Sequence, residues 1–375
     1  MKRAVALFLA VLLCVAALPV WAEDAAATDE AGVDISQLDE EEKPVTDDEA
    51  VTFVEENDGP PSIKGKKPLY TTRIKMMTST GKAVNIRYAR DTKSESLGRA
   101  NVGDTVTIYE VDPSFVLVEF EGVVGYILRT CIDENCTAVD PAATPPYGVS
   151  PCKYVGTTAQ STEIYQAKST ASTANPIVLG EGCPVAILDF EDGFAKVIYW
   201  RTYGYIPAER LTDLVMVSDT DEPLSDETPI AAFSSFFKYG EGTDMNTGRV
   251  KNIVRSCEKM TRVLQPGETL DFNANIGPYK KSEGYFPAPV LIDGKSVPGY
   301  GGGTCQSSST LYNTIRQLPG ITILYRRPHG PGGARYLPQH TDAAVGNTNL
   351  NLVFRNDYDF PLYVKAVCKG EGVLI

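Results

Sequence analysis

The sequence predicts a mostly β, multidomain protein whose last region also carries helices. Two stretches align without gaps at an offset of 79 residues, and within each of them apolar residues alternate with polar ones. Such alternation, interrupted by short polar turns, is typical of antiparallel strands. A third region, from about residue 230, instead places apolar residues at helical spacing in two segments. A chain of 375 residues is long enough for two or three domains.

The repeat is clearest near its end, where Gly125-Tyr126-Ile127 matches Gly204-Tyr205-Ile206 letter for letter. Val84-Asn85-Ile86-Arg87 opens the first copy, whereas Glu163-Ile164-Tyr165-Gln166 stands at that point in the second. Both copies read as meanders of short strands joined by tight turns.

This pattern resembles the bacterial SH3-like (SH3b) domain, whose signature opens with Val-Asn-Ile-Arg and closes with Gly-Tyr-Ile. The resemblance implies two small β-barrels, at 62–140 and 147–218. Such barrels either bind wall peptides or act as spacers. The second copy is the weaker candidate for binding, because it lacks the opening motif.

The first residues predict export. Lys2 and Arg3 precede a continuous apolar run over 4–18, which has the length of a signal-peptide core and is too short for a typical membrane span. Val20-Trp21-Ala22 then offers small residues at the −3 and −1 positions of a cleavage site. We therefore expect 1–22 to be removed and the protein to be secreted into a bacterial cell envelope. The alternative is a retained, membrane-anchored start.

An acidic stretch follows at 23–61, with 15 Asp or Glu and one Lys, a charge of −14 against −13 for the whole chain. Like charges at this density repel one another and cannot bury a core, so we expect a disordered tether. Binding of cations or of a basic surface is the alternative. The rest of the chain is near neutral and lacks the basic footprint that nucleic acid requires.

A polar linker at 219–229 leads into the third predicted domain, 230–375. Apolar residues recur at helical spacing over 247–264 and again after residue 304, which predicts helices at 247–264 and 304–317. No metal site is expected, because the cysteines and the two histidines lack the spacing of ligands, and no cofactor is implied.

A run of glycines stands before the second of these helices: Gly301, Gly302, Gly303, Thr304, Cys305 and Gln306. The glycines allow backbone conformations and close approaches that other residues do not. Cys305 would lie in the first turn of the helix, where the dipole and the unpaired amides favour a thiolate and stabilise an oxyanion. This arrangement suits a cysteine nucleophile.

The run from Gly301 to Asn313 resembles the central motif of the VanW family, named for vancomycin-resistance gene clusters. Other residues that match the family pattern are Phe233, Asn252, Ile253, Pro266, Gly267, Phe272, Asn273, Gly277, Tyr285, Arg326, His329, Tyr336, Asp342, Val345 and Phe354. The resemblance covers nearly all of 230–375 and implies an α+β domain in an envelope setting, without an established reaction. One departure is Asn351, where the family has an acidic residue.

Cys305, His329 and Asp342 are the residue types of a nucleophile, a base and a group that orients the base, and all three match family positions. His340 is less favoured as the base, because its position reads as a loop residue in the family. The alternatives are a Cys305 that is buried or disulfide-bonded, and one that binds a ligand without chemistry.

Removal of Cys14 with the signal leaves seven cysteines, so at least one is unpaired in a monomer. The pairs that we consider are Cys131 with Cys136, Cys152 with Cys183, and Cys257 with Cys368. Cys305 would then be the free thiol, although other connectivities stay open.

Two functional hypotheses follow. The first is an envelope protein whose SH3-like modules bind peptidoglycan or space the chain at the wall. The second is an exported thiol enzyme that hydrolyses or transfers acyl groups of wall peptides, with Cys305 as its nucleophile.

Overall fold

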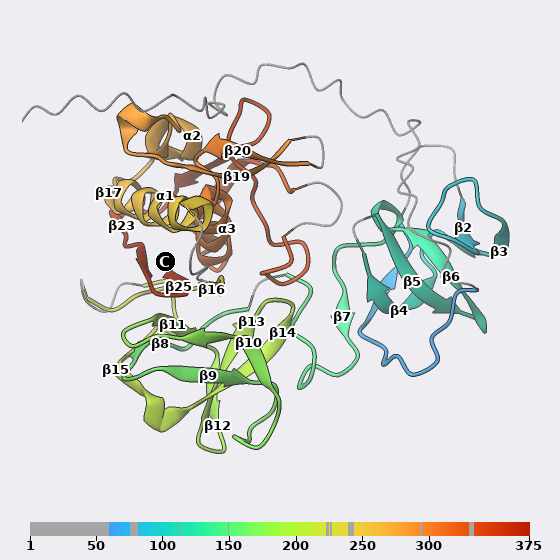
Figure 1. Ribbon diagram of the computed structural model, residues 1–375. Coiled ribbons are helices and arrows are strands. Elements are labelled where there is room, and N and C mark those ends of the chain that lie inside the picture. Colours follow the sequence, from blue (N-terminus) through green and yellow to red (C-terminus); the bar gives the residue numbers. More distant parts are fainter. Residues whose placement is uncertain are drawn as a thin grey trace, which may run out of the picture. The chain divides into compact units, whose positions relative to one another are not determined.

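The computed structural model describes residues 60–75, 82–112, 114–148, 150–222, 225, 227–238, 244–292, 295–329 and 334–375. Strands far outnumber helices over these residues, which confirms the mostly β, multidomain class (Figure 1). The predicted signal peptide and nearly all of the predicted tether lie outside the described residues. Within the described part of the chain, no helix combines the length and the apolarity that crossing a bilayer requires.

The first unit is one antiparallel sheet with the strand order β3-β2-β6-β5-β4-β1-β7. Its strands are β1 (Tyr70–Arg73), β2 (Ala83–Arg87), β3 (Ser96–Asn101), β4 (Thr105–Val111), β5 (Phe115–Phe120), β6 (Val123–Leu128) and β7 (Thr137–Ala138). Val106 and Ile108 of β4 are buried, as their alternation predicts. In β5, Leu117 is buried together with its neighbours Val116 and Val118, so this part of the strand is covered on both faces.

The second unit contains two sheets, ordered β10-β9-β14-β13-β12 and β11-β8-β15. Its strands are β8 (Tyr154–Thr158), β9 (Thr162–Tyr165), β10 (Ala174–Leu179), β11 (Pro184–Ile187), β12 (Asp189–Glu191), β13 (Phe194–Tyr199), β14 (Thr202–Pro207) and β15 (Leu211–Met216). The strands β13 and β14 begin 79 residues after β5 and β6, at Phe194 against Phe115 and at Thr202 against Val123.

The third unit combines small sheets with three helices. Its elements are β16 (Ser234–Phe236), α1 (Asp244–Met260), β17 (Arg262–Leu264), β18 (Thr269–Asp271), α2 (Phe272–Ile276), β19 (Pro287–Ile292), β20 (Lys295–Tyr300), α3 (Thr304–Ile315), β21 (Ile321–Arg326), β22 (Leu352–Asn356), β23 (Leu362–Val364), β24 (Val367–Lys369) and β25 (Gly372–Leu374). The sheets are β16-β25-β24, β17-β23, β18-β22-β21 and β19-β20.

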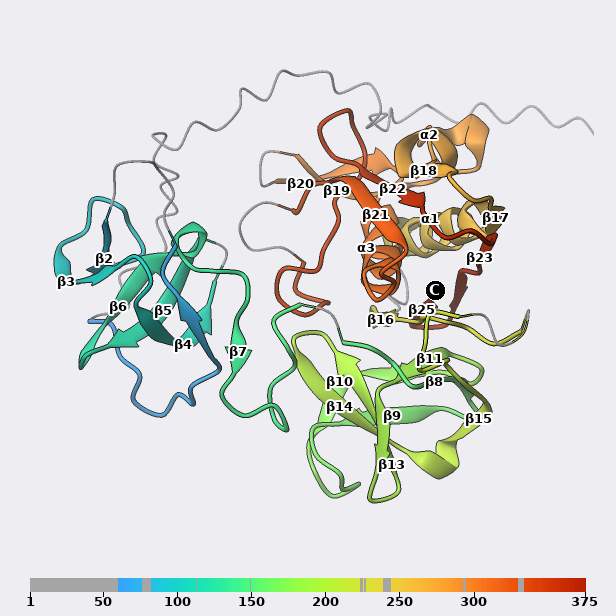
Figure 2. The same ribbon diagram turned by 180° about the vertical axis from the view of Figure 1, so that it is seen from behind.

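The core of this unit forms around two helices, α1 and α3, which lie side by side in both views (Figures 1 and 2). Ile253 and Met260 of α1 pack in one apolar cluster with Leu311 and Ile315 of α3. Both helices are therefore buried on the faces that their apolar spacing predicted.

The first helix is shorter at its C-terminal end than the sequence predicted. We expected 247–264, but α1 ends at Met260 and Arg262–Leu264 forms β17, paired with β23. The side chain of Thr261 bonds the backbone of both Cys257 and Ala366, which ties the chain to the segment between β23 and β24 at this point. Apolar residues at the end of a helical pattern fit an extended strand equally well, so spacing alone did not place the boundary.

None of the cysteines of the described residues forms a disulfide: Cys131, Cys136, Cys152, Cys183, Cys257, Cys305 and Cys368. The three expected disulfides are therefore absent from this structure.

The packing explains the corrections at Cys152, Cys183 and Cys136. Cys152 and Cys183 lie in different apolar clusters, so their thiols do not meet. The Cys136 thiol instead donates to the carbonyl oxygen of Asp133, at 3.3 Å. Cys257 and Cys368 do belong to one cluster, where both pack as small apolar side chains.

Candidate active site

Cys305 lies in the first turn of α3, at the end of the glycine run. Gly303, directly before the helix, has φ 102°, a conformation that strains any residue with a side chain. A Cβ at Gly303 would also lie 2.7 Å from Cγ of Arg249, so the backbone here packs directly against α1. Every residue of α3 is buried except Cys305, which is partly exposed.

The sulfur of Cys305 faces the backbone of Val345. The amide nitrogen of Val345 donates to Sγ at 3.5 Å, and the thiol is also within 3.5 Å of the Val345 carbonyl oxygen. The amide contact favours a thiolate, whereas the carbonyl contact serves a protonated thiol. The same backbone segment therefore accommodates the sulfur in both protonation states.

His329 and Asp342 meet in a short, double contact. The ring nitrogen Nδ1 of His329 lies 2.8 Å from Oδ2 of Asp342, and the backbone N–H of His329 donates to the same oxygen at 2.6 Å. The carboxylate therefore fixes both the position of the residue and the tilt of its ring. Since Nδ1 is bonded to Asp342, Nε2 is the ring nitrogen that remains for a hydrogen bond with the thiol.

Cys305 and His329 are electrostatically coupled. Burial raises the pKa of the Cys305 thiol, but the charge of His329 and a side-chain hydrogen bond with it lower that pKa, and the net shift is downward. Burial lowers the pKa of His329, whereas the charge of Cys305 and the bond to Asp342 raise it, and the net shift is upward. Both directions favour a thiolate paired with an imidazolium.

Arg326, at the end of β21, binds both the backbone and the carboxylate of Asp342. Its Nε donates to the carbonyl oxygen of Asp342 at 2.6 Å, and Nη2 lies 3.3 Å from the carboxylate oxygen Oδ1. Burial raises the pKa of Asp342, but bonds from His329 and the charge of Arg326 lower it, and the net shift is downward. Asp342 therefore stays charged although it is only 2% exposed.

The serines of α3 hold the segment that carries Asp342. Ser309 Oγ accepts from the amide of Ala343 at 2.9 Å, and Ser308 Oγ donates to the carbonyl of Ala343 at 2.6 Å. One turn later, Asn313 donates to the carbonyl of Thr341 at 2.7 Å. The helix that presents the cysteine thus also positions the carboxylate.

The remaining predicted residues take supporting positions. Thr304 starts the helix, with its amide bonded to the carbonyl of Gly301 at 3.0 Å. The Gln306 side chain receives a hydrogen bond from Arg249 and donates one to Ser235. Asn351, the departure from the family pattern, donates to Asp271 and lies outside the cysteine site.

His340 does not join the site. Its Nε2 lies 2.9 Å from Glu134 instead, and its φ of 64° is a turn conformation. Among the described residues, no group of three or more His, Cys, Asp or Glu side chains is placed to hold a metal ion.

The sequence marked Arg326, Tyr336 and Val345 only as matches to a family pattern and assigned them no role. Val345 acts through its backbone, so its side chain carries no signal of the contact with the sulfur. Arg249 was not marked at all, since its place beside Gly303 depends on how α1 packs against the glycine run.

Comparisons with known proteins agree with this picture. The family model described as "VanW like protein" matches residues 248–375, which include most of α1, the glycine run and all three site residues. The chain carries a VanW-like domain. A bacterial SH3 domain model matches residues 82–133, within the first unit. Together the two domains fit a cell-wall-associated protein of unestablished activity.

A relative of this VanW-like protein is the "Uncharacterized protein YoaR" of Bacillus subtilis (strain 168), which is 28% identical over 188 residues. The match covers 50% of this chain and 61% of the relative, so the chain spans about three fifths of that protein's length.

Two solved structures are similar over longer stretches at low identity, NlpC2 and NlpC1 from Trichomonas vaginalis. NlpC2 is 14% identical, with 52% of this chain and 58% of that chain covered and a TM-score of 0.17. NlpC1 is 12% identical, with 84% and 95% covered and a TM-score of 0.18. At these scores neither likeness carries an argument.

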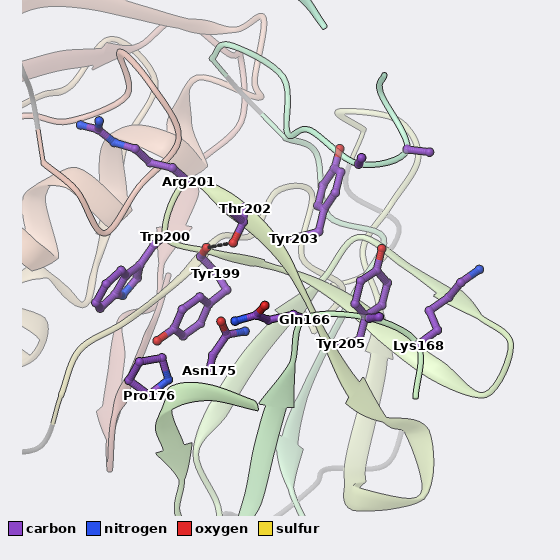
Figure 3. A pocket seen from close by; sticks show the side chains of 13 residues that line it. Gln166, Lys168, Asn175, Pro176, Tyr199, Trp200, Arg201, Thr202, Tyr203 and Tyr205 are labelled. Atoms are coloured by element: carbon purple, nitrogen blue, oxygen red, sulfur yellow. Dashed lines mark hydrogen bonds between the residues drawn. The ribbon is translucent and has the colours of Figure 1, made fainter. Parts of the chain in front are cut away.

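A separate pocket, of about 720 Å³, opens on the second unit and is rich in aromatic side chains (Figure 3). Trp200 is 38% exposed and stacks on Tyr199 with ring centroids 5.2 Å apart. Tyr203 and Tyr205, from β14, extend the aromatic wall of this pocket. The sequence marked this unit as the weaker binder because it lacks the opening motif, and that criterion takes no account of the aromatic residues at 199–205.

Proposed function

We propose that the VanW-like domain is a thiol-dependent enzyme of the cell envelope, which hydrolyses or transfers acyl groups of wall peptides with Cys305 as nucleophile. The observation that supports this best is the coupling of Cys305 to His329, whose other ring nitrogen is held by Asp342 at 2.8 Å. A nucleophile, a base and a group that orients the base is the arrangement that acyl transfer requires.

In the proposed reaction, the thiolate of Cys305 attacks the carbonyl carbon of a peptide amide, and a carbon–sulfur bond forms. The carbon–nitrogen bond of the amide then breaks as the imidazolium of His329 gives its proton to the leaving nitrogen. A water or an acceptor amine, deprotonated by the now neutral His329, attacks the thioester and releases Cys305. Asp342 keeps the ring oriented through both steps.

The test is turnover of solubilised wall peptides, with products followed by mass spectrometry. We expect Cys305→Ala to abolish product formation. Cys368→Ala is the matched control, since burial raises the pKa of the Cys368 thiol to about 12 and leaves it unreactive. Turnover that survives in Cys305→Ala contradicts the proposal.

A second proposed activity is retention at the wall by the second unit, supported by the aromatic pocket around Trp200. Aromatic faces bind the apolar faces of sugars and peptides alike. Sedimentation with purified wall would measure this activity, and Trp200→Ala should reduce the bound fraction. Equal sedimentation of the variant and the unaltered chain excludes this pocket as the contact. Export itself is tested by the N-terminus of the mature protein, expected directly after Ala22.

A further inference from the structure

Arg249 of α1 is built into the cysteine site. Its side-chain stem packs against Gly303, so closely that an added Cβ there would lie 2.7 Å from Arg249 Cγ. Its Nη2 donates to Oε1 of Gln306, the residue after Cys305, at 3.1 Å. Gln306 is held in turn by its own donation to Ser235 Oγ at 2.7 Å, which keeps Oε1 turned toward the guanidinium.

Among the residues that the structure describes, the contacts of the Arg249 side chain are with neutral groups. Besides the amide of Gln306, its guanidinium lies over the ring of Phe237, 5.1 Å from the centroid. Among the described residues, no carboxylate lies within 4.0 Å of its nitrogens. A guanidinium offers five N–H donors in a planar fork, and the bond to Gln306 uses one of them. Burial lowers the pKa of Arg249, although the charges of Tyr336, Cys368 and Cys305 oppose that shift.

Three features therefore meet at the first turn of α3, which carries Cys305: a partly buried cation, a fixed orientation and unused donors. A planar fork of this kind matches a carboxylate through two parallel hydrogen bonds, which a lysine does not reproduce.

We propose that Arg249 binds a carboxylate of the substrate, so that the enzyme acts on peptides with a carboxylate next to the acyl group that Cys305 attacks. This inference rests on the thiol chemistry proposed above, and it names the substrate class of that same site. Arg249 is a positioning residue for the reacting carbonyl.

Iodoacetate and iodoacetamide separate this proposal from the reactivity of the thiol. The two reagents alkylate the same thiolate and differ only in a carboxylate against a neutral amide. The ratio of their rates at Cys305, measured in the full chain by peptide mass spectrometry, is therefore independent of how much thiolate is present.

We expect Arg249→Gln to lower the ratio of the iodoacetate rate to the iodoacetamide rate by about tenfold, the loss of one charge-assisted pair. Arg249→Lys should lower it less, because the charge remains and the fork is lost. Arg255→Gln is the matched control on the same helix, since Arg255 bonds the backbone of Glu283 instead. Excess acetate should slow iodoacetate labelling of the unaltered chain, a readout that needs no variant.

An unchanged ratio in Arg249→Gln, together with no competition by acetate, overturns the carboxylate site and leaves the thiol chemistry standing. A Cys305 that resists both reagents in the folded chain between pH 7 and pH 9 overturns both proposals. Thermal unfolding of each variant identifies a ratio that changed only because the fold was lost.

Discussion

His329 reaches Asp342 twice, through its ring nitrogen at 2.8 Å and through its backbone amide at 2.6 Å. The backbone bond fixes the residue beside the carboxylate, and the bond to Nδ1 fixes the orientation of the ring. The free ring nitrogen is therefore directed by a buried carboxylate, which is how a base beside a thiol is kept in its working tautomer.

Replacing His329 should make the cysteine inert at neutral pH. In His329→Gln the two effects of the histidine that lower the pKa of Cys305 are gone, whereas burial still raises it, so this pKa rises. We expect the iodoacetamide rate at pH 7 to fall by about tenfold or more and to recover as the pH is raised. His340→Gln is the control, because His340 pairs with Glu134 and should leave the rate unchanged.

The pH dependence of Cys305 alkylation in the unaltered chain tests the same pairing of Cys305 with His329. Because the pKa of Cys305 is lowered, the thiolate persists as the pH falls and is lost only on passing through that lowered value. Because the pKa of His329 is raised, the imidazolium persists above its usual range and is lost as the pH rises through the raised value. We expect iodoacetamide to alkylate Cys305 rapidly already well below pH 8. A rate that depends on pH in the same way as that of free cysteine would contradict the pairing of Cys305 with His329.

Asp342→Asn should destabilise the fold at neutral pH. Removing one charge from a buried pair leaves Arg326 without its carboxylate partner, which typically costs about 3 kcal/mol. The pKa of Asp342 is lowered by folding, so its contribution is present above the unfolded value of about 3.9 and is lost as the pH falls through the folded value. Urea unfolding of both proteins between pH 3 and pH 7 measures this.

Asp189→Asn is the comparison for that experiment, because Asp189 pairs with Lys153 at an exposed position. Surface pairs contribute little, so the free energy of unfolding should hardly change. An equal loss in both variants would mean that burial of Asp342 is not the cause.

Gly303→Ala should disturb the site through two effects. The φ of 102° disfavours any side chain, and the new Cβ would meet Arg249 Cγ at 2.7 Å. Gly267→Ala separates the two effects, because Gly267 has φ 76° with no atom within 4 Å of an added Cβ. We expect about 1–2 kcal/mol of lost stability in the control and a larger loss in Gly303→Ala, measured by urea unfolding.

The seven cysteines of the described residues should differ sharply in reactivity. Burial raises the pKa of Cys136 to about 11 and the pKa of Cys152 to about 12, whereas that of Cys305 is lowered. A brief maleimide pulse at pH 7 should label Cys305 first in the folded chain, and all seven after denaturation without reductant. A mass that reports fewer than seven labels would reveal disulfides and restore the pairing expected from the sequence.

Local sequence patterns were enough to predict several strands, the start of α3 and the candidate site residues. Alternation of Val106 and Ile108 predicted a buried strand, because period 2 is a property of the extended chain itself. The glycine run predicted the start of α3 and the place of Cys305 in its first turn, since both depend on residues next to each other. Motif matches marked His329 and Asp342 as candidates, although not as neighbours.

Tertiary structure decided the rest. Arg262–Leu264 became a strand because β23 lies beside it, which no property of the segment itself reveals. Cys152 and Cys183 stay apart because they pack in different clusters. Asp342 contacts the imidazole of His329 and not that of His340, because hydrogen bonds to the serines of α3 hold the Ala343 segment in place. The sequence names the residues that have the right chemistry, but their distances follow from packing between segments far apart in the chain.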